Sequence, residues 1–375
     1  MSSPYRTPTQ TITTPITKLF GIKHPVILAG MNVAAGPELA AAVTNAGGLG
    51  VIGGFGYTPE LLREQITTLK SFLKDPKGPF GVDLLLPQVG GNARKTNYDY
   101  TGGKLADLIN IIIEEKTTLF VGAVGVPPKW VVEKMHAAGI AVMNMIGSPK
   151  HVEKALEAGL FRSWTSLGVD LLCPQGGEGG GHTGEIATSI LIPKVVDMVK
   201  GHKSPLTGGP VLVVAAGGIF DGRGLAMALS FGAGAVWVGT RFVCAKEAGA
   251  PPRHQQAIVK AGYHDTVRTV IFTGRPMRVL KTSYTDKWEL KQDEIRKLTS
   301  EGVIPAKKDM EERLASPEEI TPEEMSAGLP LLMGQAAGAI TDVLPAQDII
   351  HEMVNGAIDA LKQATSYVSG PKAKL

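Results

Sequence analysis

The sequence has few cysteines, few charged residues and no long hydrophobic run. Its two cysteines, Cys173 and Cys244, are too few for a disulfide framework or a zinc cage, and they suit a reducing compartment. Charged residues make up only 19% of the chain, and the net charge of +3 forms no basic stripe for nucleic acid. No apolar run reaches the ~20 residues of a membrane span, and the N-terminus lacks the apolar core of a signal peptide. We therefore expect a protein that binds neither nucleic acid nor a membrane.

Glycine, in contrast, is abundant, with 46 residues among 375. The glycines follow no Gly-x-y period and stand among Val, Ile, Leu and Ala, which excludes collagen and argues against disorder. The length allows one large domain or two ordinary ones, and it is sufficient to bury a core without disulfides.

Short apolar runs bounded by turn residues predict eight strands. The runs are Pro25–Ala29, Leu49–Gly53, Phe80–Leu85, Leu119–Gly122, Ile140–Met145, Val169–Cys173, Val211–Ala215 and Ala235–Gly239. None alternates polar and apolar residues, which is typical of parallel strands buried on both faces. Helical patterns follow these runs at Pro37–Ala46, Thr58–Leu73, Leu105–Glu115, Pro128–Ala138, Ser148–Ala158, Ser189–Lys200, Gly222–Phe231 and Arg253–Ala261. Eight strand–helix units in about 240 residues predict an α/β fold, a TIM (β/α)8 barrel, with a doubly wound sheet as the alternative.

The segment Lys281–Gly328 differs from the rest of the chain because 20 of its 48 residues are charged. Such a segment must be mostly solvated, so we expect a smaller helical insertion or lid domain outside the barrel. The pattern of Ala346–Leu361 predicts an amphipathic helix that packs back on the barrel. The predicted organisation is a barrel with an N-terminal lead-in over residues 1–280, the charged insertion over 281–328, and a return segment over 329–375.

The active site of such a barrel lies at the C-terminal ends of its strands, so the residues after each run are the candidates for chemistry. Two turns follow the seventh and eighth runs, at Gly217 and Gly218 and at Gly239 and Thr240. Loops at these positions commonly hold a phosphate, because glycine lets backbone N–H groups approach an anion at the start of a helix. The alternative is that the glycines only permit tight turns. The two turns together favour a phosphate-bearing ligand.

The loop after the sixth run has six glycines between Gly176 and Gly184, and it can lie flat against a planar ligand. Its one histidine, His182, is suited to proton transfer near neutral pH, and the alternative is a cap for the next helix. Asp83 lies within the third run, where a buried carboxylate is costly without a partner. This carboxyl would either meet a ligand or accept a hydrogen bond from a neighbouring backbone amide.

These segments together resemble the nitronate monooxygenase family, formerly called 2-nitropropane dioxygenases. The resemblance covers roughly residues 16–280 and 329–350. Its motifs are Pro25–Met31 (PVILAGM), Ala46–Gly54 (AGGLGVIGG), Phe80–Asp83, Gly179–Gly184 (GGGHTG), Ala215–Gly224 (AAGGIFDGRG), Val238–Phe242 (VGTRF), Thr273–Leu280 (TGRPMRVL) and Gly334–Gly338 (GQAAG). The family implies a TIM barrel that binds FMN non-covalently, with a smaller second domain over the barrel mouth.

The resemblance implies roles for residues of this chain, and none of them is a metal ligand. His182 matches the family's catalytic histidine, the base that takes the α-proton of a nitroalkane or assists nitronate oxidation. The residues that would line or border the flavin are Ala29, Gly30, Met31, Asp83, Gln175, Gly180 and Gly181. The residues that would hold the FMN phosphate are Ala216, Gly217, Gly218, Gly239 and Thr240, in agreement with the cradle inferred above from position.

Three features depart from the family pattern. The family often has Asn where this chain has Asp83, and a carboxylate there would disfavour an anionic reduced flavin unless it is protonated or paired. The segment Leu86–Thr101 is long, and Phe161–Thr165 looks inserted. Both segments would reshape the substrate pocket.

We therefore predict an FMN-dependent oxidoreductase that oxidises alkyl nitronates, or nitroalkanes, with O₂ to a carbonyl compound and nitrite. One alternative keeps the barrel and FMN but uses NAD(P)H to reduce an enoyl thioester or a quinone, with Arg94, Lys95 and Arg241 as candidate contacts to an anionic substrate. A second alternative is a non-redox barrel that binds a phosphate ligand. The expected partners are a small-molecule substrate and O₂, and a homodimer stays open. The expected location is the cytoplasm, or the peroxisome in a eukaryote, because Ala373-Lys374-Leu375 resembles the Ser-Lys-Leu address.

Overall fold

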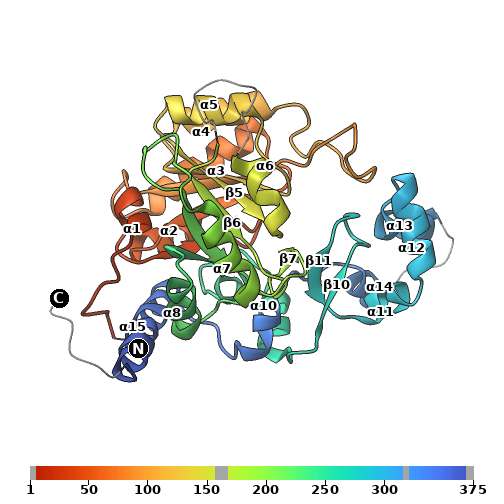
Figure 1. Cartoon of the computed structure of the whole chain (residues 1–375). Coiled ribbons are helices and arrows are strands. Elements are labelled where there is room, and N and C mark those ends of the chain that lie inside the picture. The colour runs from red at the N-terminus through yellow and green to blue at the C-terminus, as the bar shows by residue number, and fades with distance from the viewer. Residues whose placement is uncertain (1–5, 157–167, 316–320, 369–375) are drawn as a thin grey trace.

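The computed structural model describes residues 6–156, 168–315 and 321–368. Within these ranges, eight parallel strands form one sheet in the order β1-β9-β8-β6-β5-β4-β3-β2 (Figure 1). The strands are β1 (Val26–Leu28), β2 (Gly50–Gly54), β3 (Phe80–Leu85), β4 (Leu119–Ala123), β5 (Ala141–Ile146), β6 (Leu171–Pro174), β8 (Leu212–Ala216) and β9 (Ala235–Val238). A parallel bridge between Ile27 and Leu49 joins the two ends of this order. The sheet therefore closes into a barrel, which confirms the predicted TIM fold and excludes the doubly wound sheet.

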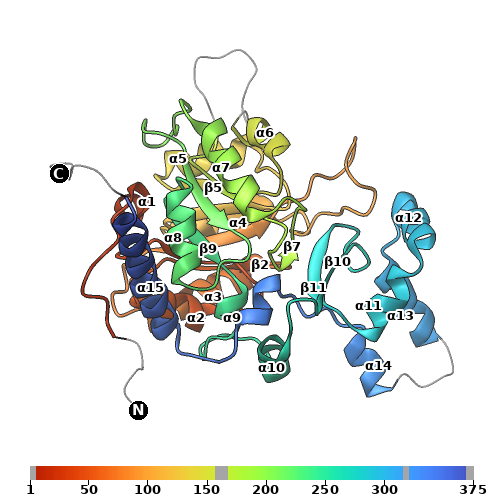
Figure 2. The same ribbon diagram turned by 60° about the horizontal axis from the view of Figure 1, so that its bottom comes forward.

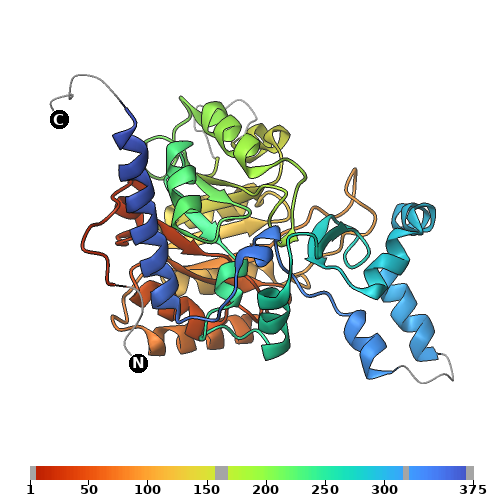
Figure 3. The ribbon, with the colours of Figure 1, turned by 90° about the horizontal axis from the view of Figure 1, so that it is seen from below.

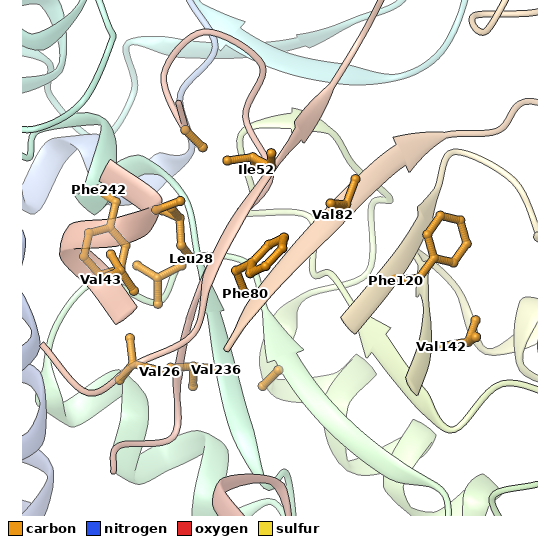
Figure 4. Close-up of a cluster of buried hydrophobic side chains, with 14 of the residues drawn as sticks. Val26, Leu28, Val43, Ile52, Phe80, Val82, Phe120, Val142, Val236 and Phe242 are labelled. Carbon is orange, nitrogen blue, oxygen red and sulfur yellow. The ribbon is translucent and has the colours of Figure 1, made fainter. Parts of the chain in front are cut away.

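Each barrel strand is buried on both of its faces. Val26 and Leu28 pack against the surrounding helices, whereas Ile27 packs inside the barrel with Val121 and Trp237. Successive side chains of a strand point to opposite faces, and here both faces meet apolar neighbours. Figure 4 shows part of the outer cluster, between the strands and the helices. This two-sided burial explains why the strand sequences are continuously apolar.

Helices cover the outside of the barrel (Figures 1 and 3). They are α2 (Pro37–Asn45), α3 (Pro59–Phe72), α4 (Leu105–Glu114), α5 (Lys129–Ala137), α6 (Val152–Leu156), α7 (Thr188–Val199), α8 (Gly222–Ser230), α9 (Thr240–Val243) and α10 (Pro252–Lys260). The helix predicted at Ser148–Ala158 begins as a 3-10 turn over Pro149–His151 and continues as the short α6, and its predicted last two residues lie outside the described residues. A proline at the start of this segment fits such a tight turn.

A short helix that the sequence analysis did not anticipate, α1 (Pro15–Phe20), fills the N-terminal end of the barrel. Thr14 and Thr17 form a capping box at its start, and the Thr14 hydroxyl donates to the Gly234 carbonyl just before β9. Ile16 and Phe20 belong to the apolar cluster inside the barrel. Access to the barrel interior is therefore left to the opposite end, where the strands finish.

Beside the barrel lie a small antiparallel sheet and four helices (Figures 1 and 2). The sheet contains β10 (Thr266–Thr269), β11 (Met277–Leu280) and β7 (Gly181–His182), and the helices are α11 (Ser283–Glu289), α12 (Gln292–Glu301), α13 (Pro305–Ala315) and α14 (Pro322–Ala327). This part has its own apolar cluster, which includes Tyr284, Trp288 and Ile295. Since β7 comes from the loop after β6, the small sheet is joined directly to the barrel mouth. The division of the chain at residues 280 and 328 stays a prediction.

The chain returns to the barrel through a 3-10 turn, η2 (Gln335–Ala339), and a long helix, α15 (Ala346–Ser366). This helix packs against α8 and α2, on the side of the barrel away from the small sheet (Figure 3). The contact with α8 is close, because a Cβ on Gly222 would lie 2.4 Å from the backbone nitrogen of Ala357. The absence of a Cβ at position 222 is thus needed for α15 to pack this closely against α8.

None of the helices in the described ranges has the length and apolar character needed to cross a membrane. Two features noted in the sequence, Phe161–Thr165 and Ala373-Lys374-Leu375, lie outside the described residues.

Candidate active site

A cavity of about 2260 Å³ opens at the C-terminal ends of the barrel strands. The thirteen residues expected from the sequence to be catalytic or to contact the cofactor all line it, although they come from segments more than 200 residues apart. They are Ala29, Gly30, Met31, Asp83, Gln175, Gly180, Gly181, His182, Ala216, Gly217, Gly218, Gly239 and Thr240. The carboxyl ends of parallel strands meet at one edge of a barrel, which is why these distant segments converge.

One side of the cavity has the geometry of an anion cradle. Gly217 and Gly218 adopt φ values of 102° and 70°, and a Cβ on Gly217 would lie 2.7 Å from the backbone nitrogen of Gly176. Position 217 therefore requires glycine both for its conformation and for its space. Gly239 precedes α9, and the Thr240 hydroxyl accepts a hydrogen bond from the Gly334 amide at 2.9 Å. Its O–H is then oriented as a donor, beside glycine turns that can expose their amides to a phosphate.

Glu178 is a neighbour of this cradle that the sequence analysis did not identify. A Cβ on Gly218 would approach the Glu178 side chain at 3.1 Å. The Glu178 carboxylate accepts hydrogen bonds from the Thr188 amide, at 3.0 and 3.1 Å, and from the Thr188 hydroxyl, at 2.8 Å. It therefore caps the start of α7, a favourable place for negative charge.

Asp83 lies in the wall of the cavity as an isolated carboxyl. It is 2% exposed, and its Oδ1 atom is buried without a hydrogen-bond partner among the described residues. A Cβ on Gly30 would lie 2.5 Å from Asp83 Oδ2, so the glycine leaves room for this side chain. Burial raises the pKa of Asp83 to about 8. The carboxyl is therefore mostly protonated at pH 7 and can donate a hydrogen bond.

The groups nearest to Asp83 are also uncharged at pH 7. Burial, together with the proximity of Asp83, raises the pKa of Tyr57 to about 12. The same two causes raise the pKa of the Cys173 thiol well above its usual range. Cys173 is completely buried inside the barrel, as expected for an inert cysteine. This end of the cavity is consequently apolar and neutral.

His182 is held in the small sheet beside the barrel mouth. Its backbone pairs with Met277 of β11, and its carbonyl accepts a hydrogen bond from Gln175 Nε2 at 2.8 Å. Its ring Nε2 lies 3.1 Å from the Thr273 hydroxyl. Burial, together with the positive charge of Arg275, lowers the pKa of His182 to about 4. The imidazole is therefore neutral at pH 7 and can accept a proton. The alternative role, a cap for the next helix, is wrong, because the His182 ring contacts Thr273 and the Thr188 amide at the start of α7 donates to Glu178 instead.

Thr273 and Arg275 were not identified as site residues from the sequence, although they fall in a segment that carries the family resemblance. Arg275 donates to Asn97 Oδ1 at 3.0 Å and to the Val124 carbonyl at 2.9 Å. It thereby joins the small sheet to the loops after β3 and β4. No spacing in the sequence relates Thr273 to His182, since 91 residues separate them.

Basic side chains stand around the cavity, and three of them had been noted in the sequence. Arg94 is exposed and lines the cavity. Lys95 does not line it, and Arg241 is a structural residue, because its side chain is 5% exposed and pairs with Asp342 at 2.7 Å. Three further exposed lysines line the same cavity, namely Lys129, Lys150 and Lys154. The four exposed cationic side chains outnumber the three exposed carboxylates that line the same cavity, those of Asp99, Glu153 and Glu185. The rim therefore carries an excess of positive charge, whereas Asp83 in the interior is mostly neutral.

Comparisons with known proteins find relatives that cover most of this chain. The sequence model of the nitronate monooxygenase family matches residues 13–356. A (3aS,4S,5R,7aS)-5-hydroxy-7a-methyl-1-oxo-octahydro-1H-indene-4-carboxyl-CoA dehydrogenase of Mycobacterium tuberculosis is 33% identical, over 95% of this chain and 99% of its own. A probable nitronate monooxygenase of Staphylococcus saprophyticus is 32% identical, over 76% of this chain and 83% of its own. The structure of FabK from Thermotoga maritima is 31% identical, has a TM-score of 0.75, and covers 96% of this chain and 100% of that one.

Proposed function

This chain belongs to the nitronate monooxygenase family of enzymes, and from that premise we propose that it is an FMN-dependent oxidoreductase. The cavity fits the cofactor at both ends. The turns at Gly217 and Gly239, together with the Thr240 hydroxyl, offer donors to the phosphate, and position 217 has no space for a Cβ. Gly30 and Gly181 line the cavity and would lie beside the ring system. Bound FMN would supply the two-electron redox chemistry.

The proposed reaction is the oxidation of an alkyl nitronate, or of its parent nitroalkane, with O₂ to a carbonyl compound and nitrite. The role of His182 is to take the α-proton of a nitroalkane and to hold that proton beside the substrate. When ring Nε2–H donates to Thr273, the lone pair on Nδ1 is the one that accepts the proton. The single observation that supports this role is a half-buried imidazole held by Thr273 in the cavity wall, and its lowered pKa leaves it neutral at pH 7.

The first experiment is a visible spectrum of the purified full chain with FMN added, followed by anaerobic reduction. We expect absorbance near ~450 nm from bound flavin, bleaching when an alkyl nitronate is added, and nitrite release once air is admitted. Bleaching by NAD(P)H alone would favour the reductase alternative. A colourless protein that does not bind FMN would contradict both flavin proposals and favour a non-redox barrel.

A second candidate substrate is an acyl or enoyl thioester with a phosphate-bearing carrier, and the charge of the rim favours it. Arg94, Lys129, Lys150 and Lys154 line the cavity with exposed cationic side chains. Lys129 lies 3.7 Å from Glu133, and Lys154 donates to the Gln88 amide oxygen at 3.3 Å, so neither interaction neutralises the rim fully. A small nitronate needs only one cationic contact, whereas the phosphates of a carrier need several. The M. tuberculosis relative is described as acting on such a carboxyl-CoA ester.

Steady-state kinetics separates the two substrate classes. The thioester proposal predicts that FMN is reduced by NAD(P)H or by a saturated acyl-CoA, and that raising the salt concentration increases KM. The nitronate proposal predicts turnover without a nucleotide and a much weaker dependence of KM on salt. Failure of acyl-CoA, enoyl-CoA and NAD(P)H to change the flavin spectrum would exclude the second candidate.

A further inference from the structure

Exposed apolar side chains concentrate in the wall of the cavity. Sixteen large hydrophobic side chains of the described residues are exposed, and five of them line this one cavity. These five are Val33, Phe55, Val89, Tyr98 and Leu332. Single exposed apolar residues are ordinary on a protein surface, but several that line the same cavity mark a place where a ligand or partner binds.

Three aromatic rings form the centre of this apolar wall. Phe55 follows β2, whereas Tyr98 and Tyr100 belong to the long segment between β3 and α4. The Tyr100 ring lies 4.7 Å from the Tyr98 ring and 5.0 Å from the Phe55 ring, centroid to centroid, with both pairs edge-to-face. Tyr100 is buried, while Phe55 and Tyr98 are each 47% exposed. The buried ring therefore supports two rings that leave part of their surface open to the cavity.

This aromatic group is fixed in position relative to His182 by three consecutive residues. Thr273 bonds the His182 ring, and Arg275 donates to Asn97, the residue before Tyr98. Gly274, which lies between them, contacts Thr96 so closely that any side chain there would collide with it. A rigid link of this kind sets the distance between the proton-accepting group and the aromatic rings. That arrangement suits one ligand that contacts both.

We propose that Phe55 and Tyr98 form a specificity subsite that binds an apolar, ring-bearing part of the substrate while the reacting carbon lies beside His182. The identification of the reacting carbon rests on the proposed function, but the ring-binding subsite can be tested by binding alone. The occupant is a part of the substrate and not a protein, because the rings face the same cavity that His182 lines. Edge-to-face contact with an added ring would complete the aromatic cluster.

The test compares two carboxylates that share the planar, anionic end of a nitronate, 3-phenylpropionate and propionate. Isothermal titration calorimetry on the FMN-supplemented full chain measures both dissociation constants. We expect the wild type to bind 3-phenylpropionate at least about tenfold more tightly, the contribution of one well-packed aromatic contact. The double variant Phe55→Ala/Tyr98→Ala should reduce this ratio to about two or less and leave the affinity for propionate unchanged.

Two controls keep the result decisive. Tyr367→Ala removes a tyrosine that is more exposed than Tyr98, at the end of α15 and outside the cavity, and should preserve the ratio. Phe55→Leu/Tyr98→Leu keeps most of the apolar volume if the alanine variant does not fold, and should still lower the ratio, because the aromatic contacts are lost. Equal affinities for the two carboxylates in the wild type, undetectable binding of both, or an unchanged ratio in the folded variants would overturn the subsite.

The subsite and the proposed function fail in different measurements. If the protein binds no FMN and releases no nitrite, yet loses its preference for 3-phenylpropionate when Phe55 and Tyr98 are replaced, the oxidoreductase proposal is wrong and the subsite stands. If nitronate turnover is observed without any preference for the ring-bearing ligand, the oxidoreductase proposal stands and the subsite is wrong.

Discussion

Replacing Asp83 by Asn would reveal whether the carboxyl at the barrel mouth is neutral in the folded protein. The two side chains have nearly the same shape, but only the carboxyl can ionise. Burial raises the pKa of Asp83 from 3.8 to about 8, and no cationic group is among the causes of the shift. Between these two pH values the folded protein keeps a proton that the unfolded chain has lost.

The free energy of unfolding must therefore fall as the pH rises from about 4 to about 8, because unfolding then releases the proton. At pH 7 this penalty is about 4 kcal/mol, at ~1.36 kcal/mol for each pH unit above 3.8. Water penetration and relaxation of the site make this value an upper bound. Asn carries no such penalty, so the variant should gain stability relative to the wild type as the pH rises.

The measurement is the melting temperature of both proteins without added FMN, recorded at several pH values between 5 and 7.5. The difference between variant and wild type should grow by up to about 6 °C over this range, at ~1.36 kcal/mol per pH unit and ~2 °C per kcal/mol. Parallel melting curves would refute the reasoning, because they would mean that Asp83 ionises in the folded protein as readily as in the unfolded chain.

Asp170, a second buried aspartate, provides a control, because its pKa is shifted in the opposite direction. It accepts hydrogen bonds from the Ser204 hydroxyl at 2.6 Å and the Val142 amide at 2.8 Å, and it lies 2.8 Å from His136 Nε2. Burial alone would raise its pKa, but these partners together lower it. Its stabilising contribution is thus complete above pH 4 and is lost only in stronger acid. Asp170→Asn should destabilise the protein by roughly 3 kcal/mol at pH 7.5, whereas Asp83→Asn should gain stability relative to the wild type.

Three further outcomes follow from the site. His182→Asn should lower kcat/KM on a nitroalkane by about 10²–10⁴-fold while leaving the flavin spectrum intact, and an unchanged kcat/KM would reject its role as the base. The wild-type rate should show no inflection from His182 above pH 5, since its pKa is about 4. Gly217→Ala should weaken FMN binding in a fluorescence titration by at least about tenfold. Gly90→Ala should not, because Gly90 also has positive φ but has open space around it. Equal FMN affinities of the two variants would refute the phosphate site at Gly217. Lys150→Glu should raise KM several-fold for a CoA thioester and leave KM for a nitronate nearly unchanged. An unchanged KM for both substrates would show that Lys150 does not contact the phosphates of the thioester.

Much of the fold was readable from the sequence because the barrel strands carry a strong local signal. Continuous apolar runs such as Leu119–Gly122 are typical of strands buried on both faces, and they fell within one or two residues of the observed strands. The short segments were harder. Neither α1 nor the two-residue strand β7 shows enough periodicity to be recognised, and the helix predicted at Ser148–Ala158 begins as a 3-10 turn.

The candidate site also contains some residues that the sequence identified and others that it did not. The residues at strand ends, such as Gly217 and Gly239, could be assigned to one place because every parallel strand of a barrel finishes at the same rim. Arg275 and Thr273 could not, because they reach the site from the small antiparallel sheet, whose position depends on packing between distant segments. Glu178 was overlooked within its own loop, since its role at the start of α7 depends on a turn that only the folded loop adopts.

The sequence by itself determined the barrel, the position of the glycine turns at its mouth and the identity of one histidine there. These depend on local properties, namely the apolar character of each strand and the freedom of glycine to adopt positive φ. The tertiary structure alone decided the protonation of that histidine and of Asp83, because desolvation depends on every neighbour that excludes water. It also decided that Phe55 and Tyr98 share one wall of the cavity, since their two loops meet only after the barrel has closed.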